Sequence, residues 1–478
     1  MKKRFFPSNS PFQKTLTRDV KTNHYSLLPI PYSLKCGIII FMKIIIIGAG
    51  PAGMAAAIAA AENPDNDVVV LEKNDIPGKK LLVSGSGRCN VTNGINIEEF
   101  LSRYGGRDRF VKPALLSFTN RDLMQFFNAR RVPMTTMENG KVFPRTERSR
   151  DVQQALIEEM QRCGVKLVTQ AAVRDVKYQS ESEFPFTVVT ADKTYQANRV
   201  VIATGGKSYP STGSTGDAYA WAESLGHTVS TPVPALTPVK IEGDFTLKSC
   251  AGIAMPCLSM TLRRGGRKVT DFSGDIIITH TGFSGPGILD NSRFMTPGDE
   301  LSICWVDPST AVKLDKVIIE TLEQAGKKTI KHALSVLGLP DRLLEKFLTL
   351  AGIELDPRPK LGDPPSKRVM ASHQFFPCRI YGDSPGMTKQ QRKEFVKYLR
   401  ESRWIIDSLG DFNDAMVTAG GVITTEVNRQ TMESRIVPGL YFAGEVLDVD
   451  ADTGGFNLQW AFSSGVMAGK ASGEGSRQ

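Results

Sequence analysis

Apolar residues follow two different patterns in this 478-residue chain. Short unbroken apolar runs lie within residues 44–47, 68–71 and 199–206, which is typical of parallel strands covered on both faces. From about residue 238 the pattern changes towards alternation, and segments such as 259–263 and 275–279 indicate β structure. The chain therefore predicts an α/β region followed by a separate β region.

Helical spacing is found in the first region at residues 109–130 and 151–163. Residues 165–169, 172–178 and 186–190 follow as three short apolar segments, which predict a small meander. A stretch rich in glycine and serine, residues 78–93, is predicted to be a loop.

A helical region is predicted between residues 309 and 402. Its clearest helices are expected at 341–351 and 389–401, with proline-rich connections at 356–365. The chain then returns to the first pattern through 415–421, 439–445 and a final helix of small residues at about 457–469.

These patterns predict an α/β fold with a discontinuous Rossmann-like domain. The nucleotide domain comprises residues 42–235 and 413–478. It is interrupted by an insertion with a β, barrel-like part (236–308 and 403–412) and a helical part (309–402).

The first apolar strand runs directly into a glycine turn that predicts a dinucleotide site. Gly48 allows the tight turn, Gly50 lets the backbone approach a pyrophosphate, and Gly53 lets the next helix pack closely. Pro51 and Ala52 open that helix, whose free N–H groups would face the phosphates.

An acidic residue follows the second apolar strand. Glu72 stands roughly 20 residues beyond the glycines, where a ribose hydroxyl is held in such folds. Because a carboxylate disfavours a 2′-phosphate, FAD or NAD fits this site better than NADP.

The net charge of +9 is concentrated at the start of the chain. Residues 1–41 carry seven basic residues and one acidic residue, which leaves +3 for the rest. This leader precedes Met42 and has three interpretations: an upstream extension with Met42 as the true start, a disordered natural tail, or a targeting segment. With +3 on the rest and no aromatic–basic run, we expect no nucleic-acid partner.

The cysteines give information about compartment and metal chemistry. The seven cysteines are widely spaced and none forms a CxxC pair, which favours reduced thiols in a cytoplasm. No Cys/His cluster has metal-ligand spacing, and no segment is long enough to span a membrane.

Several motifs together resemble a known bacterial family. They are GAGPAG at Gly48, SGSGRCNVTN at Ser84, VIATGG at Val201, THTGFSGPGIL at Thr279, VTAGGV at Val417 and GLYFAGEVLDVDADTGGFNLQWAFSSG at Gly439. The chain from Met42 onwards resembles FAD-binding oxidoreductases with a glutathione-reductase-type FAD domain, labelled aminoacetone-oxidase-like or 3-dehydro-bile-acid-reductase-like. The resemblance implies FAD and a redox role.

The resemblance and the residue chemistry together suggest a set of cofactor contacts. Glu445 is expected against the ribityl chain, and the helix start after Gly455 would place N–H groups near the flavin N1/C2=O region. Arg88 would neutralise phosphate. The candidate set is Gly48, Gly50, Pro51, Ala52, Gly53, Glu72, Lys73, Lys80, Ser84, Gly85, Arg88, Cys89, Val173, Thr204, Gly205, Gly444, Glu445, Gly454, Gly455, Phe456, Asn457 and Leu458.

Two residues are candidates for chemistry beyond cofactor binding. Cys89 is either a redox residue or a small packing residue, and His280 either borders a substrate cavity or is a structural histidine. No metal ligand is predicted.

The sequence therefore predicts an FAD-dependent oxidoreductase that transfers hydride through the flavin. We expect NAD(P)H as a transient donor and a small carbonyl or enone-type substrate. Because a second GxGxxG motif is missing, NAD(P)H would bind outside a second Rossmann domain. The alternatives are an O₂-using amine or ketone oxidase and an RNA-associated or redox-sensing flavoprotein. The oligomeric state is not encoded in any motif.

Overall fold

A computed structural model describes residues 42–325, 329–353 and 387–474. The predictions for the leader and for the connections at 356–365 lie outside these residues. No helix in the described ranges is long and apolar enough to cross a membrane.

The nucleotide domain is built on a five-stranded parallel sheet in the order β19-β10-β1-β2-β6. Its strands are β1 (Lys43–Ile47), β2 (Asp67–Leu71), β6 (Lys166–Val168), β10 (Arg199–Ile202) and β19 (Leu440–Phe442). Ile44 to Ile47 are almost fully buried, as their unbroken apolar run predicts.

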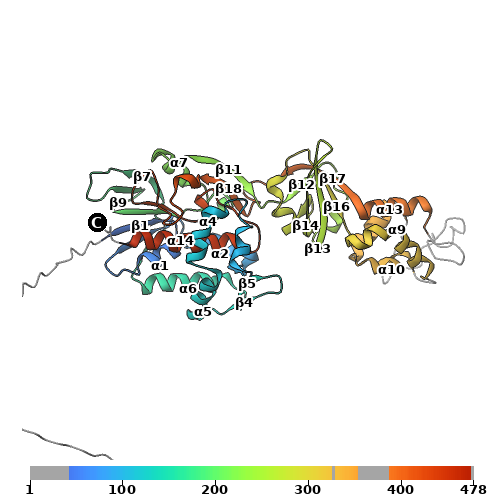
Figure 1. The fold of residues 1–478 in the computed structure, drawn as a ribbon, viewed down its shortest axis with the longest axis horizontal. Helices are drawn as coiled ribbons and strands as arrows, with labels where there is room; N and C mark the ends of the chain where they lie inside the picture. The colour runs from blue at the N-terminus through green and yellow to red at the C-terminus, as the bar shows by residue number, and fades with distance from the viewer. Residues whose placement is uncertain (1–41, 326–328, 354–386, 475–478) are drawn as a thin grey trace, which may run out of the picture. The chain divides into compact units, whose positions relative to one another are not determined.

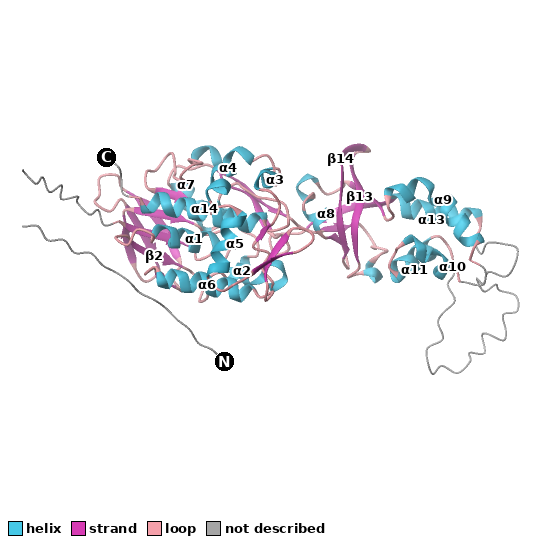
Figure 2. Cartoon of the chain, turned by 60° about the horizontal axis from the view of Figure 1, so that its bottom comes forward, coloured by secondary structure: helices cyan, strands magenta, loops and turns pink. Residues whose placement is uncertain are grey.

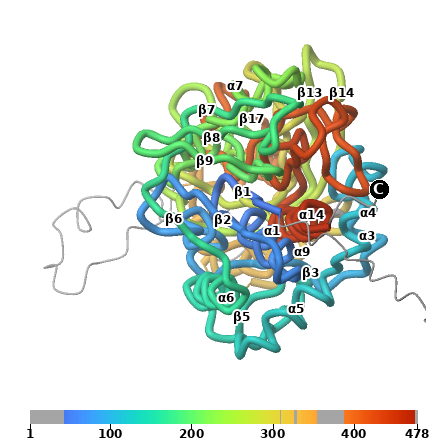
Figure 3. Tube along the Cα trace, turned by 90° about the vertical axis from the view of Figure 1, so that its left-hand side faces the viewer, coloured from blue at the N-terminus to red at the C-terminus, as the bar shows by residue number. Residues whose placement is uncertain are grey.

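The predicted meander is wrong in its first strand. The segment from Lys166 to Val168 pairs in parallel with β2 at the sheet edge, because α6 (Ser149–Arg162) carries the chain back across the sheet. The meander is instead formed by β7 (Val173–Tyr178), β8 (Phe186–Thr190) and β9 (Thr194–Ala197). Figures 1 and 3 show it on the sheet face opposite to α1 and α14.

Helices α1 (Pro51–Ala60) and α14 (Phe456–Gly473) lie side by side along a seam of small residues (Figure 1). A Cβ atom at Gly465 or Gly469 would lie 2.3 Å or 2.2 Å from the carbonyl oxygens of Ala52 and Ala56. The glycines in α14 therefore set the close approach of the two helices, and with it the position of both helix N-termini.

The segment 78–93, predicted to be a loop, contains a helical turn. Residues Lys79–Val83 form α2 because Leu81 is buried and its carbonyl accepts a hydrogen bond from the Ser84 hydroxyl at 2.7 Å. A 3₁₀ turn, η1 (Ser84–Gly87), follows.

A small subdomain of helices and strands follows. Its helices are α3 (Ile97–Leu101), α4 (Asp108–Ser117) and α5 (Asn120–Ala129), and its three-stranded sheet contains β3 (Thr92–Asn93), β5 (Lys141–Pro144) and β4 (Met134–Thr136). The helical spacing at 109–130 thus corresponds to two helices, separated where Thr119 caps α5.

The insertion begins with a closed six-stranded barrel, as its alternating segments predicted. The strand order is β12-β15-β14-β13-β16-β17. Its strands are β12 (Val239–Ile241), β13 (Ala254–Arg264), β14 (Arg267–Ile278), β15 (Gly282–Ser284), β16 (Glu300–Cys304) and β17 (Ser402–Leu409). Short helix α8 (Pro286–Leu289) follows β15.

Two strands connect the barrel to the nucleotide domain. They are β11 (Val229–Ala235), which follows helix α7 (Asp217–Ser224), and β18 (Val417–Val422), and they pair in an antiparallel sheet.

The helical part of the insertion shares a hydrophobic core with the barrel. Its helices are α9 (Pro308–Glu323), α10 (Ile330–Leu334), α11 (Asp341–Leu350) and α13 (Lys389–Glu401), which confirms the helices predicted at 341–351 and 389–401. Trp305 of the barrel packs on Phe347 of α11 at 5.5 Å between ring centroids. Figure 2 shows these helices grouped beyond the barrel strands.

Candidate functional site

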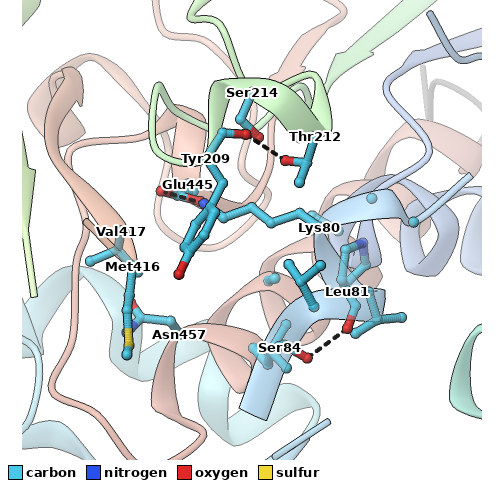
Figure 4. A pocket seen from close by; sticks show the side chains of 18 of the residues that line it. Lys80, Leu81, Ser84, Tyr209, Thr212, Ser214, Met416, Val417, Glu445 and Asn457 are labelled. Carbon is cyan, nitrogen blue, oxygen red and sulfur yellow. Dashed lines mark hydrogen bonds and ion pairs between the residues drawn. The ribbon is translucent and has the colours of Figure 1, made fainter. Parts of the chain in front are cut away.

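A cavity with a volume of about 800 Å³ is lined by residues of the nucleotide domain and the insertion (Figure 4). This volume lies in the upper part of the range for ligand sites. The N-termini of α1 and α14 both open onto it, together with the ends of β2 and β10. Most of the predicted cofactor residues therefore meet in one place.

The glycines of the first turn have separate functions. Gly48 adopts a φ of +101°, and a Cβ at Gly53 would lie 1.8 Å from the Gly48 carbonyl oxygen. Gly53 therefore serves helix packing and does not line the cavity. A Cβ at Gly50 would meet no atom within 4 Å. Gly50 thus leaves open space in front of the α1 N-terminus, which is where an anionic pyrophosphate fits.

Glu72 is a fixed carboxylate in the wall of the cavity. It is only 6% exposed and accepts hydrogen bonds from the Ala49 N–H at 2.8 Å and from the Asn74 N–H at 2.9 Å. The next residue, Lys73, forms an ion pair with Asp217 at 2.6 Å. Val173, predicted near adenine, also lines the cavity, as do Thr204 and Gly205 at the end of β10.

Lys80 and Glu445 form an ion pair at the cavity wall, with a distance of 2.8 Å between Nζ and Oε2. The Ser208 hydroxyl and the Thr418 N–H each donate to Glu445 Oε1 at 2.8 Å. Glu445 is thus held by three elements of the chain. Ser208 was not singled out from the sequence, and Thr418 was only part of the VTAGGV motif.

The loop after α2 presents backbone and one cation to the cavity. Ser84, Gly85 and Arg88 line it, and the Arg88 guanidinium lies over the Phe143 ring at 4.8 Å. Cys89 is fully buried and is not among the lining residues. Burial raises the pKa of the Cys89 thiol to about 12, although a hydrogen bond with Ser84 lowers it. A neutral buried thiol favours the packing role that the sequence left open.

The start of α14 forms another wall. Gly454 and Gly455, with φ of +121° and +99°, line the cavity together with Asn457 and Leu458. The Asn457 side chain holds the preceding loop by accepting from the Ala451 N–H and donating to the Ala451 carbonyl, at 2.9 and 2.7 Å.

Two further predicted cofactor residues, Phe456 and Gly444, do not line the cavity. Phe456 packs edge-on against Phe100 at 4.9 Å. Gly444 lies under the wall, where a Cβ would be 2.9 Å from the Ala52 Cβ. Both are placed to support the site rather than to line it.

The insertion contributes a carboxyl that contacts the α14 loop. Asp290 accepts hydrogen bonds from the Thr453 N–H and hydroxyl at 2.6 and 3.1 Å. Burial raises the pKa of Asp290 to about 6, and the hydrogen bonds from Thr453 lower it. Arg293 lies 3.2 Å from Asp450 and 3.3 Å from Asp452, and burial still raises the pKa of both carboxyls.

His280 lies on an exposed turn of the barrel and does not line the cavity. Tyr209, which was not a candidate, does line it, with its ring extending into the space shared with Lys80, Glu445 and Met416 (Figure 4). Its φ is +53°, a strained value for a tyrosine, and it precedes Pro210. None of the motifs named in the sequence contains this residue.

The arrangement is that of a dinucleotide-binding domain of an oxidoreductase. It combines a parallel sheet, two helix N-termini that face one cavity, and an acidic residue at the end of the second strand. The chain belongs to the HI0933-like family, because the model described as "HI0933-like protein Rossmann domain" matches residues 42–471. The chain is an FAD-dependent oxidoreductase, as the motifs predicted.

Relatives with assigned functions cover nearly the whole chain. It is 31% identical over 440 residues to the 3-dehydro-bile acid delta(4,6)-reductase of Clostridium scindens, covering 90% of this chain and 99% of the relative. It is also 31% identical over 424 residues to the ribosomal RNA dihydrouridine synthase of Escherichia coli, covering 88% and 95%.

Among solved structures, the chain also matches the 3-ketosteroid-delta4-(5alpha)-dehydrogenase of Rhodococcus jostii RHA1 in complex with 4-androstene-3,17-dione. The identity is 16%, the TM-score is 0.43, and the alignment covers 91% of this chain and 97% of that one.

Proposed function

We propose that this enzyme reduces a carbon–carbon double bond conjugated to a carbonyl group, with NAD(P)H as the electron donor. The main support is one continuous cavity. It joins the N-termini of α1 and α14 to a wall made by side chains of the insertion and of the chain segments next to it. The substrates in the relatives' names share this group, since a 3-dehydro delta(4,6) bile acid and uridine both contain a double bond conjugated to a carbonyl.

The substrate side of the cavity has walls with extensive apolar surface. Leu236, Ile277 and Leu289 provide apolar surface, and Met416 faces the Tyr209 ring. An enone ring would be desolvated against these side chains, which strengthens any hydrogen bond made to its carbonyl.

FAD, when bound, supplies two-electron hydride chemistry. The N–H groups at the start of α14 would hold negative charge on the reduced ring, and Gly454 and Gly455 would permit its close approach. Reduction of a double bond also requires a proton. The Tyr209 hydroxyl has no hydrogen-bond partner among the described residues and faces the cavity, so we assign it as the candidate donor.

The cytoplasm is the proposed compartment, because it supplies NAD(P)H and suits thiols in the reduced state. Five cysteines in the described ranges are free: Cys89, Cys163, Cys250, Cys257 and Cys304.

The test is an anaerobic titration of the FAD-loaded protein with NADH and with NADPH. Loss of the oxidised flavin absorbance by either donor supports the proposal. The reduced enzyme is then mixed with a panel of enones and saturated ketones, and only the enones should reoxidise it. An O₂-using oxidase would instead resist NAD(P)H, accept electrons from an amine or ketone, and release peroxide.

A uridine within RNA is the second candidate substrate, and the charge distribution favours it. Residues 309–402 contain 17 lysines and arginines against 11 aspartates and glutamates. The remaining residues from 42 onwards contain 35 against 38. The net charge of +3 on residues 42–478 is therefore the sum of a basic helical part and a slightly acidic remainder. A polyanion such as RNA, which would carry the uridine, fits this concentration of positive charge in the helical part.

A further inference from the structure

A second hollow, which shares no residue with the cofactor cavity, lies between α13 and the barrel strands β13 and β16. Its volume is about 530 Å³. Four cationic side chains line it, together with the hydroxyl-bearing residues of the two strands. The cations are Arg263, Lys393, Lys397 and Arg400, the hydroxyls belong to Ser259, Thr261 and Ser302, and Glu401 is the acidic residue of the lining. We call this site the α13 groove.

The cations of α13 form a row because of their spacing. Lys393, Lys397 and Arg400 stand at positions i, i+4 and i+7, which places them on one face of the helix. Phe395 and Leu399 anchor the adjoining face in the shared core. The row is therefore carried by a rigid helix and not by a loop.

The positive charge of the groove is poorly neutralised within the protein. Neither Lys393 nor Arg400 has a carboxylate within 4.0 Å among the described residues. Lys397 lies 3.7 Å from Glu394, and Arg263 lies 3.9 Å from Glu300 and 3.8 Å from Glu401. Four cations and the single carboxylate of Glu401 around one hollow leave a net positive charge, and an anion bound there relieves the repulsion between the cations.

The donor chemistry of the α13 groove matches phosphodiesters. Lysine, arginine and hydroxyl donors are the groups that contact nucleic-acid phosphates. Protein–protein interfaces are instead depleted of lysine and enriched in aromatic residues, and the groove has two lysines and no aromatic residue.

We propose that the α13 groove binds the phosphate backbone of a structured RNA and thereby recruits the RNA whose uridine is reduced in the cofactor cavity. This inference rests on the second candidate substrate above. The target base would have to be extruded from the duplex, because enzymes that act on a base take it out of the stack. RNA helices are recognised mainly through such backbone contacts.

The test uses full-length, FAD-loaded protein and a ribosomal RNA transcript in filter-binding assays at several salt concentrations. The triple variant K393Q/K397Q/R400Q should lose at least about tenfold in affinity, and its salt slope should fall by about 2 to 3. R263Q, on the opposite wall, should lose affinity independently. The matched control K112Q/R174Q/K193Q removes the same charges from exposed positions of the nucleotide domain and should stay within about twofold of wild type.

Binding and catalysis are read separately, so the two proposals fail in different ways. Flavin reduction by NAD(P)H should be equal in wild type, triple variant and control. Equal RNA affinity and salt slope in the folded triple variant and R263Q would overturn the groove proposal while leaving the reductase intact. Polyglutamate that competes as well as RNA of equal charge would also overturn the assignment to RNA. RNA binding lost in the triple variant, without any uridine or enone reduction, would contradict the proposed function alone.

Discussion

The nucleotide domain and the insertion position their functional groups in different ways. In the nucleotide domain, the cofactor site is formed largely by backbone, by the turn at Gly48 and by the starts of α1 and α14. In the insertion, the contact with the α14 loop and the proposed RNA site depend on side chains, those of Asp290 and of the α13 row. A backbone-defined site leaves a glycine pattern in the sequence, whereas a side-chain site depends on folding to bring its members together.

The largest expected effect contrasts two neighbouring glycines. In Gly53→Ala, the new Cβ would lie 1.8 Å from the Gly48 carbonyl, so α1 must move. We expect the free energy of unfolding of the FAD-free protein to fall by about 4 kcal/mol or more, as measured by urea denaturation. Gly50→Ala should leave this free energy within about 1 kcal/mol while weakening FAD binding. Equal stability of both variants would contradict the division of labour assigned to these glycines.

Tyr209→Phe tests the cavity that the two regions line together. Loss of the hydroxyl should slow enone reduction by the reduced enzyme by about 10²-fold, the usual scale for a proton donor. Flavin reduction by NAD(P)H, followed in the same stopped-flow instrument, should change less than about twofold. An equal slowing of both half-reactions would point to a packing role for the tyrosine.

Asp290 provides a pH test of the insertion side. Its folded-state pKa, about 6, is raised above its ordinary value of 3.8, so the folded protein holds this proton more tightly than the unfolded chain does. Stability from this group is present in full below about pH 4 and is lost as pH rises to about 6. The loss should be about 3 kcal/mol.

Asp290→Asn should remove that part of the pH dependence. The comparison is the difference between wild-type and variant unfolding free energies at several pH values, which cancels the other carboxyls. If the difference between the two unfolding free energies is constant from pH 4 to 7, the burial of Asp290 does not raise its pKa in the folded protein.

The smallest effect is expected for the ion pair at the cavity wall. Lys80→Met leaves Glu445 with hydrogen bonds from Ser208 and Thr418 only, so we expect a stability loss of about 1 kcal/mol for this partly exposed pair. Lys80→Met combined with Glu445→Gln should recover part of the loss in a double-mutant cycle. A coupling energy of zero would mean that the pair does not stabilise the wall.

Much of the nucleotide domain could be predicted from sequence because its signals are local. The run of four isoleucines, the glycine turn and Glu72 lie within 30 residues and belong to one βαβ unit. The segment at 165–169 was misassigned to the meander because its pairing with β2 depends on α6, and not on its own residues. Family membership and FAD followed from motifs of the same local kind.

Residues whose placement depends on distant parts of the chain were less predictable for a physical reason. Tyr209 of the nucleotide domain lines the cavity with a strained backbone conformation before Pro210, and none of the motifs contains it. His280 looked motif-like but lies exposed on the barrel. The expectation of no nucleic-acid partner came from averaging charge over residues 42–478, which hides the basic helical part. It stays a prediction, and the α13 groove proposal opposes it.

The most direct test of the central claim is anaerobic reoxidation of the NAD(P)H-reduced enzyme, with mass spectrometry of the products. The two acceptors are a 3-keto-delta(4,6) steroid and a ribosomal RNA transcript. At least one acceptor is expected to reoxidise the flavin without O₂ and to gain hydrogen atoms at its conjugated double bond. A reduced flavin that is stable to both acceptors, and is reoxidised only by O₂ with release of peroxide, would contradict the central claim.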